Sequence, residues 1–486
     1  MEHKIFWMIL LILNLLKFLL MEIRIIFAKK LCYLTEYKNT ISLKYTNDIV
    51  SCKNMFWGLK NIKEIDLSHF DASQVTDMHA MFRGCSKIVS LNLLGLNTNN
   101  LKNMSYMFCQ CTNLQSIDFG YMNTSSVEDM NELFSQCYNL KSLDISKFDT
   151  SKVTTMLSMF YDCYILENIN LGNITTSSVQ NMRSLFNGCL KLTSIDLSNF
   201  DTLKVTTMYR MFYEFKTLTY INLTNFDTPK VRDMSYMFFN CSKLLSINLE
   251  NFNTSLVENL VNLFCDCWSL KSIDISNFNT SKVTNMYAMF CRCYNLENIN
   301  LSNINTSLVK NMRSLFNNCI KWDMVDLSSF DTSQFTTFQQ MFKNCPNLKY
   351  LNLSNFKTPK VTTIFGMFQN CSSLIYLNLY SFKVNSTVNI TDAFYSISSY
   401  AKYCVKDNET QNYLLGNNRT SNCSDPCFNE NNKKIDIINN TCIESCIIHW
   451  FEYEYKTLCY EECPNNTYPL LCDEEICFIL HKNVIL

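Results

Sequence analysis

The chain has 486 residues, of which 47% are hydrophobic and 17% charged, and its formal net charge at pH 7 is -1. A charge so close to balance gives no electrostatic surface for nucleic acid or for an anionic membrane. Glycine occurs only eight times, and the motifs GxGxxG and GxxxxGK[ST] are absent, so the sequence excludes the usual phosphate-cradling loops.

Residues 1–28 are interpreted as a secretory signal peptide. Their apolar run from Ile5 to Leu20 is interrupted by Asn14 and Lys17, and it is shorter than the roughly 18 residues of an ordinary membrane-spanning helix. No small-x-small cleavage site stands out, so an uncleaved signal anchor that attaches the chain to a membrane is the alternative. Residues 29–51 are interpreted as an N-terminal cap for the segment that follows.

The dominant feature is a methionine- or leucine-phenylalanine pair that recurs every 26 residues. The pairs run from Met55-Phe56 to Met367-Phe368, and Ala393-Phe394 is a decayed last copy. A fixed period of this length predicts a solenoid of stacked turns. Residues 52–397 are therefore assigned to one solenoid of 13–14 turns.

Each turn reads approximately C-xx-L-xx-I-D-L-S-x-F-D-T-S-x-V-xx-M-xx-M-F. The L-x-L alternation has period two, which predicts a short β-strand that pairs in parallel with the neighbouring turns. The V-xx-M-xx-M-F stretch is interpreted as a short helix or an irregular turn that packs its Val, Met and Phe into the core. The predicted fold class is α/β, a leucine-rich-repeat solenoid followed by a small disulfide-rich module.

Two segments show the repeat clearly: LDISKFDTSKVTTMLSMFYDC (143–163) and IDISNFNTSKVTNMYAMFCRC (273–293). They resemble the BspA-like leucine-rich-repeat family, which has 26-residue repeats in surface proteins of bacteria and protists. The resemblance covers about residues 52–397. It implies surface display and a role in adhesion or host contact, although a fold does not by itself determine a function.

The residue inside each L-x-L is Asp or Asn in all thirteen turns compared, and strand geometry points it at the concave face. It is interpreted as a structural ladder of short polar groups, with a partner-binding track as the alternative; because Asp and Asn interchange freely, a calcium site is not expected. Tyrosines appear two positions earlier in some turns, and exposed aromatic side chains are enriched at interfaces. The candidate concave binding face comprises Asp118, Asp144, Asp196, Asp274, Asp326, Tyr220, Tyr350 and Tyr376.

The 25 cysteines fall into two populations. Eleven form a column three residues after the repeated phenylalanine, and they are interpreted as buried free thiols that act as small hydrophobic groups, with inter-turn disulfides as the alternative. Residues 398–486 lose the 26-residue register and contain nine more, in a pattern typical of a disulfide-stapled module, with zinc binding as the alternative. This segment is similar to furin-like or growth-factor-receptor cysteine-rich repeats. The candidate disulfide cysteines are Cys404, Cys423, Cys427, Cys442, Cys446, Cys459, Cys463, Cys472 and Cys477.

Eighteen N-x-[ST] sequons occur in this asparagine-rich chain. They become informative if the chain is secreted, because glycans are then expected on some turns. The candidate glycosylation sites are Asn123, Asn173, Asn253, Asn279, Asn305 and Asn418.

No HExxH, GxSxG or kinase motif is present, and none of the five histidines has a spaced partner for a metal or triad motif. The sequence therefore predicts a protein that is not an enzyme and needs no metal or cofactor. It predicts a secreted or cell-surface protein that mediates adhesion to, or recognition of, a protein or glycan partner on another cell or matrix. The alternatives are a self-associating coat or matrix protein, and an intracellular scaffold if the N-terminal segment is not a signal.

Overall fold

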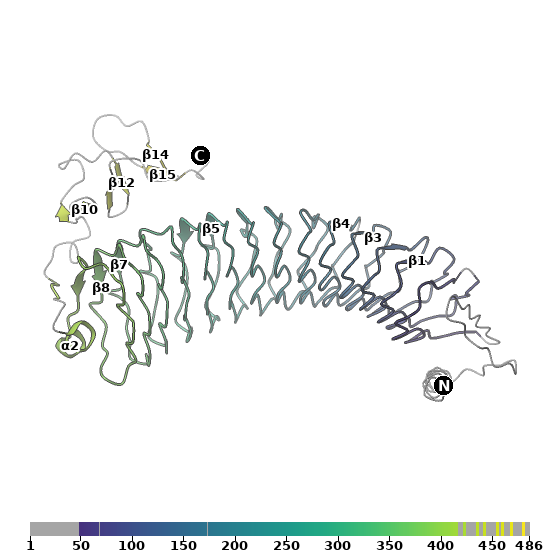
Figure 1. Ribbon diagram of the computed structural model, residues 1–486, viewed down its shortest axis with the longest axis horizontal. Helices are drawn as coiled ribbons and strands as arrows, with labels where there is room; N and C mark the ends of the chain where they lie inside the picture. Colours follow the sequence, from purple (N-terminus) through teal and green to yellow (C-terminus); the bar gives the residue numbers. More distant parts are fainter. Residues whose placement is uncertain are drawn as a thin grey trace, which may run out of the picture. The chain divides into compact units, whose positions relative to one another are not determined.

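The computed structural model describes residues 48–67, 69–172, 174–416 and 421–423, and the backbone of six short strands between residues 434 and 481. The chain forms two compact units, residues Met1–Leu256 and Val257–Leu486. Within the described part of each unit, the repeat folds into short strands and turns that stack at the 26-residue period (Figure 1).

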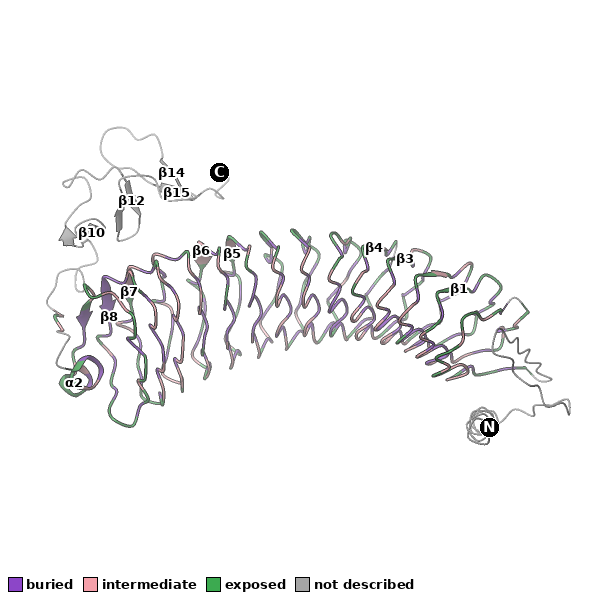
Figure 2. Ribbon diagram, viewed as in Figure 1, coloured by how far each residue is buried: buried purple, intermediate pink, exposed green. Residues whose placement is uncertain are grey.

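In the first unit the strands occupy the predicted L-x-L region. Strands β1 and β2 pair in parallel, as do β3 and β4, with each residue opposite the one 26 positions later. The central residue of each strand is less exposed than its two neighbours, buried in β1 and β3 and intermediate in β2 and β4, as the period-two pattern predicted (Figure 2 colours the ribbon by burial). The strands are β1 (Ser90–Asn92), β2 (Ser116–Asp118), β3 (Ser142–Asp144) and β4 (Asn168–Asn170).

The stretch around the Met/Leu-Phe pair is an irregular turn and not a helix. Its N–H groups bond to the next turn, as in Phe82 N to Met107 O at 2.9 Å and Gly84 N to Cys109 O at 2.8 Å. The residue before each pair and the second residue after the phenylalanine have left-handed φ values, such as 53° at Ala80 and 63° at Gln110. A left-handed residue interrupts the α-helix, so the backbone bonds between turns instead.

The core is built from columns of identical side chains. The rings of Phe82, Phe108 and Phe134 lie parallel, with 5.6 Å between successive centroids, and all three are fully buried. Such offset stacks add stabilisation to the area that the rings bury. The buried threonines form a second column, in which Thr176 Oγ1 donates to Asp201 O at 2.7 Å and accepts from Asp201 N at 2.8 Å.

The cysteine column consists of buried free thiols, as predicted. Each thiol that forms a described bond donates to a phenylalanine backbone oxygen of the preceding turn; Cys111 Sγ bonds Phe82 O at 3.1 Å and Cys137 Sγ bonds Phe108 O at 3.2 Å. Burial raises the pKa of the Cys85 and Cys371 thiols to about 12. Since the thiolate is the reactive form, the column is chemically inert near neutral pH.

The second unit has the same architecture. Strands β5 and β6 pair in parallel, and β7, β8 and β9 form a three-stranded parallel sheet. The strand ladder thus continues beyond residue 397, the expected end of the solenoid, and helix α2 follows β9. Asp407 caps this helix by accepting the N–H of Thr410 at 2.8 Å. The elements are β5 (Ser272–Asp274), β6 (Asn298–Asn300), β7 (Tyr350–Asn352), β8 (Tyr376–Asn378), β9 (Lys402–Cys404) and α2 (Asn408–Leu415).

Six further strands are described within the expected cysteine-rich segment. Four form a sheet in the order β11-β10-β13-β12, and β14 pairs antiparallel with β15. The strands are β10 (Lys434–Asp436), β11 (Thr441–Ile443), β12 (Tyr453–Tyr455), β13 (Leu458–Tyr460), β14 (Thr467–Pro469) and β15 (Ile479–His481).

Candidate recognition surface

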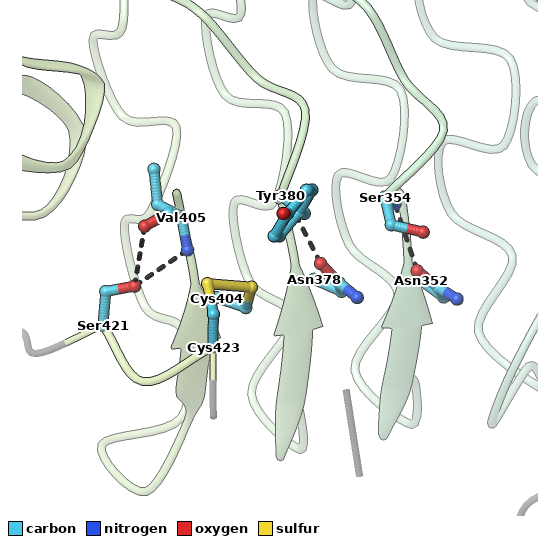
Figure 3. The surroundings of a disulfide bond; sticks show 8 residues. All are labelled: Asn352, Ser354, Asn378, Tyr380, Cys404, Val405, Ser421 and Cys423. Atoms are coloured by element: carbon cyan, nitrogen blue, oxygen red, sulfur yellow. Dashed lines mark hydrogen bonds between the residues drawn. A yellow bond between two sulfur atoms is a disulfide. The ribbon is translucent and has the colours of Figure 1, made fainter. Parts of the chain in front are cut away.

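The five aspartates of the predicted binding face are exposed, but each carboxylate is bonded to its own chain. In every case Oδ1 accepts the backbone N–H two residues later, at 2.9 Å. Asparagines elsewhere in the column make the same bond, as Asn352 does with Ser354 N and Asn378 with Tyr380 N, both at 3.1 Å (Figure 3). Only one side-chain oxygen is needed for this turn, which explains why Asp and Asn interchange. The residues are Asp118, Asp144, Asp196, Asp274 and Asp326.

These hydrogen bonds also affect charge. The side-chain and backbone groups of Ser146 hold the pKa of Asp144 below its ordinary value, and the backbone N–H of Ser198 does the same for Asp196. Hydrogen bonds to a carboxylate favour its charged form. Asp144 and Asp196 are therefore negatively charged turn caps on an exposed strand surface.

The three predicted contact tyrosines differ in exposure. Tyr220 is 56% exposed, Tyr350 is half-buried and Tyr376 is fully buried. The expectation that Tyr376 is exposed was wrong, because β9 adds another strand beside β8. Lys402 lies opposite Tyr376 in this pairing, and its Nζ donates to the phenolic oxygen at 3.0 Å and sits 4.9 Å from the ring centroid.

Four of the candidate glycosylation sites are described. Asn253, Asn279 and Asn305 are exposed and Asn123 is half-buried; all four accept the N–H of the serine two residues later through Oδ1, at 2.9–3.1 Å. Asn123 also donates from Nδ2 to Asn99 Oδ1 at 2.8 Å. The remaining candidates, Asn173 and Asn418, lie outside the described residues.

Two of the candidate disulfide cysteines are joined. Cys404 at the end of β9 bonds Cys423, with 4.5 Å between their Cα atoms and a sequence separation of 19 (Figure 3). Ser421 fixes the returning segment, because its Oγ accepts Val405 N at 2.8 Å and donates to Val405 O at 3.1 Å. The side chains of Cys427, Cys442, Cys446, Cys459, Cys463, Cys472 and Cys477 lie outside the part of the chain that is described.

A cluster that sequence reasoning missed lies at the turns that carry the Met/Leu-Phe pairs. We call it the turn-face cluster. The Arg183 guanidinium lies 4.3 Å from the centroid of Tyr209. The Arg210 guanidinium lies about equally far from three rings, at 5.1 Å from Tyr209, 4.9 Å from Tyr213 and 5.0 Å from Tyr236. Its members are Arg183, Tyr209, Arg210, Tyr213, Tyr236 and Phe239.

The cluster is partly exposed and internally packed. Tyr213 stacks on Phe239 with 4.9 Å between ring centroids, and Tyr209 meets Tyr236 edge-on at 5.8 Å. Arg183 is exposed, whereas the other five side chains are half-buried. Burial, followed by the nearby Glu214 carboxylate, raises the pKa of Tyr213, so its phenol stays neutral and able to donate a hydrogen bond.

The sequence does hold a signal for this cluster. The positions that flank the Met/Leu-Phe pair vary from turn to turn, and in other turns they carry small or polar residues such as Ser105, Asn131 and Ser158. Arginine–tyrosine pairs also occur at these positions elsewhere, as Arg83 with Tyr106 and Arg313 with Tyr287, but the turn-face cluster brings six such side chains together from consecutive turns. Comparing turns for variable positions, and not only for uniform ones, would have found it.

Among the described residues, no group of three or more His, Cys, Asp or Glu side chains is arranged to hold a metal ion. Over the same part of the chain, no helix combines the length and the apolar character needed to cross a bilayer.

Several solved structures are similar to this chain at low identity. A leucine-rich-repeat protein from Bacteroides ovatus ATCC 8483 is 17% identical over 67% of this chain and 86% of its own, with a TM-score of 0.39. TLR13 in its complex with ssRNA13 is 17% identical over 67% and 50%, with a TM-score of 0.25. The functional domain of InlJ from Listeria monocytogenes, whose description includes a cysteine ladder, is 14% identical over 74% and 65%, with a TM-score of 0.18.

No curated protein matches the chain. A family model described as "Mycoplasma protein of unknown function, DUF285" matches residues 27–143, 128–220, 215–299 and 292–407. These overlapping matches cover most of the chain and coincide with the stacked turns. The chain therefore belongs to the DUF285 family and folds as a leucine-rich-repeat solenoid.

Proposed function

We propose that the chain is a secreted or surface-displayed leucine-rich-repeat protein that recognises a protein or glycan partner through the turn-face cluster. The cluster itself carries this proposal. Six arginine and aromatic side chains from three consecutive turns meet on a partly exposed surface, and none belongs to the columns that build the repeat. A repeat-based role in binding also agrees with the resemblance to BspA-like surface proteins.

The chemistry of the cluster suits recognition. Tyrosine and arginine are the residues most enriched at binding hot spots, because each offers a large contact area together with hydrogen-bond donors. Here the rings and guanidinium groups already hold one another, so little side-chain entropy is lost when a partner binds. The exposed Arg183 presents a planar set of N–H donors, which suits carboxylate, sulfate or sugar hydroxyl oxygens.

Two features support secretion. The N-terminal apolar run has the composition of a signal peptide, and the disulfide between Cys404 and Cys423 is of a kind that persists in oxidising compartments. The free cysteines of the repeat are compatible with such a compartment. Their column is buried, and the raised thiol pKa values slow oxidation.

The compartment is tested by the intact mass of the chain from its own cells, measured with thiol labelling and with or without glycosidase. Loss of the first 20–30 residues, attached N-glycans and a protected Cys404–Cys423 pair are expected. A chain that keeps Met1, carries no glycan and has every cysteine reduced would instead be an intracellular scaffold.

Recognition is tested by binding the full chain to arrays of glycans and of extracellular-matrix proteins. Three substitutions each introduce a residue that another turn carries at the same position: Tyr209→Gln (as Gln339), Arg210→Gln (as Gln340) and Tyr213→Asn (as Asn317). At least one variant is expected to weaken saturable binding by more than about tenfold, the scale of a hot-spot residue. Tyr121→Ala is the matched control, because Tyr121 is 83% exposed and lies outside the cluster.

Three results would contradict the proposal. The first is saturable binding that none of the three variants weakens, since it would place the partner surface elsewhere. The second is the absence of saturable binding to any arrayed ligand. The third is concentration-dependent or disulfide-linked polymerisation of the purified chain, which would favour the self-associating coat protein.

A further inference from the structure

Three cysteines lie directly after the repeated phenylalanine, outside the column of eleven: Cys109, Cys265 and Cys291. Cys265 and Cys291 occupy the same position in neighbouring turns of the second unit. Cys109 has no cysteine at the equivalent position of the next turn, where Ser135 stands. The pair and the single cysteine thus offer an internal comparison.

The backbone holds Cys265 and Cys291 side by side. The inter-turn bonds from Phe264 N to Met289 O at 2.9 Å and from Asp266 N to Cys291 O at 2.8 Å bracket the pair. Neighbouring segments bonded in this way lie about 4.8 Å apart. That spacing falls inside the range of about 4.4–6.8 Å between Cα atoms that a disulfide requires.

The two thiols are close enough for each to shift the pKa of the other, and Cys265 Sγ also donates to Asp266 Oδ2 at 3.6 Å. The column thiols of the Cys291 turn and of the turn after it are directed elsewhere. Cys293 Sγ donates to Phe264 O at 3.1 Å and Cys319 Sγ donates to Phe290 O at 3.4 Å, so these sulfurs are directed at backbone oxygens and not at one another. Stacked cysteines in the column therefore do not interact as a pair, whereas the two cysteines directly after the phenylalanines do.

The charges around the pair favour a thiolate on Cys291. The neighbouring Cys265 thiol lowers the pKa of Cys291, and the Arg292 guanidinium adds to the effect. Arg292 is held in place by an ion pair with Asp266, whose carboxylate also accepts the Trp268 indole N–H at 3.0 Å. The neighbouring Cys291 thiol, followed by burial, raises the pKa of Cys265.

Solvent exposure also favours Cys291 as the first thiol to react. Cys291 is 9% exposed and Cys265 is 2% exposed, whereas the column cysteines Cys293 and Cys319 are fully buried. A small reagent therefore meets Cys291 first. A thiolate that is reachable, beside a second thiol, is the arrangement of an oxidisable pair with an attacking and a resolving cysteine.

We propose that Cys265 and Cys291 form a thiol-oxidation site that closes to an inter-turn disulfide by exchange with a small-molecule disulfide such as oxidised glutathione. The Cys291 thiolate attacks one sulfur of the reagent, the reagent S–S bond breaks, and one thiolate leaves. The leaving thiolate takes the proton of Cys265, whose sulfur then attacks Cys291 Sγ and expels the second reagent half, which is protonated by solvent. Two protein thiols are oxidised and one reagent disulfide is reduced to two thiols.

The experiment uses the full chain, reduced and then equilibrated over a series of oxidised-to-reduced glutathione ratios. Remaining thiols are alkylated under denaturing conditions before digestion with trypsin. The peptide 283–292 contains Cys291 as its single cysteine, and 244–271 contains Cys265 and Cys267. We expect these two peptides to appear joined, at the sum of their masses less two hydrogens, with fragment ions that place the bond on Cys265. Cys109 and the column cysteines should remain alkylatable.

Substitutions separate the two steps. Cys265→Ser should accumulate glutathione on Cys291, because the resolving thiol is missing, and Cys109→Ser, the matched control, should leave closure unchanged. Arg292→Gln should slow the first step by roughly threefold for each unit by which the pKa of Cys291 rises, since stronger nucleophilicity offsets part of the lost thiolate. The proposal fails if the wild-type chain gives no joined peptides, if the bond lies on Cys267, or if Cys109 oxidises as readily as the pair.

Discussion

The strand face and the turn face of the solenoid use their polar residues in opposite ways. On the strand face one column is always Asp or Asn, and its side-chain oxygens are bonded to the backbone two residues later. On the turn face the positions that flank the Met/Leu-Phe pair change from turn to turn, and Arg210 is held among three tyrosines. Side chains at the uniform Asp/Asn positions are hydrogen-bonded to the backbone, so the side chains at the variable positions are the ones available to contact a partner.

The largest expected effect comes from placing a charged side chain in the buried core between the strand face and the turn face. Leu197 is 2% exposed, and Leu197→Asp would bury a carboxylate without a partner. We expect a loss of about 4 kcal/mol or more of local stability, confined to the adjacent turns, because each turn contacts only its neighbours. Amide hydrogen exchange measures this region by region. Ser194→Asp, on the exposed strand face, is the control and should change exchange little; protection left intact around residue 197 would contradict the assignment of the core.

Substitutions in the buried threonine column test whether a uniform residue is required for its hydrogen bonds to the backbone. Thr176→Val keeps the shape but leaves both Asp201 O and Asp201 N without their partner. We expect a cost of about 2–3 kcal/mol, because two buried backbone groups lose their bonds. Thr206 donates to Gln180 O from an exposed position, so Thr206→Val should cost less than about 1 kcal/mol. Stability is measured by amide hydrogen exchange in the flanking turns. Equal losses of stability in the two variants would show that the buried hydrogen bonds are not what makes the threonine necessary.

The sequence predicted the repeating architecture because its signal recurs. The 26-residue period, the strand at L-x-L and the inward phenylalanine are repeated so often that single deviations do not obscure them. The free-thiol column was predicted for the same reason: Phe215 replaces one cysteine with an apolar group, which indicates a buried site, and the structure places it fully buried.

The features that were missed depend on single turns. Tyr376 is buried because β9 pairs with β8 at the 26-residue offset. The expectation that the register is lost after residue 397 was therefore wrong for β9, whose sequence no longer shows the L-x-L motif. The irregular turn was not distinguished from a helix because its left-handed positions are filled mostly by residues other than glycine, such as Tyr106 and Arg210. The turn-face cluster was overlooked because its members are spread over three turns at positions without a consensus residue.

The aspartate caps separate geometry from charge. Asp144→Asn keeps the oxygen that accepts Ser146 N and removes only the charge, whereas Asp144→Ala also removes the oxygen and should cost about 1 kcal/mol. The pKa of Asp144 is lowered in the folded chain, so its carboxylate contributes stability above the unfolded value of about 3.9. That contribution disappears as the pH falls through the lower folded pKa. Thermal melts between about pH 2 and 6 should therefore converge for the wild-type chain and the Asn variant as acidity increases. A constant difference between them would mean that the charge is not coupled to folding.

The smallest effect concerns the left-handed positions of the turn face. Ser158 has a φ of 52°, and Gly366 occupies the same position of another turn with a φ of 58°. A side chain is strained in this region and glycine is not, so Ser158→Gly should raise stability by about 0.5–1 kcal/mol. Ser125 is not left-handed, and Ser125→Gly should lower stability by a similar amount, because glycine adds only freedom to the unfolded chain. Opposite shifts of the melting temperature in these two variants would show that the backbone, and not the hydroxyl, decides the outcome. Shifts of the same sign would mean that the strain at the turn face is relieved by contacts of the serine side chain.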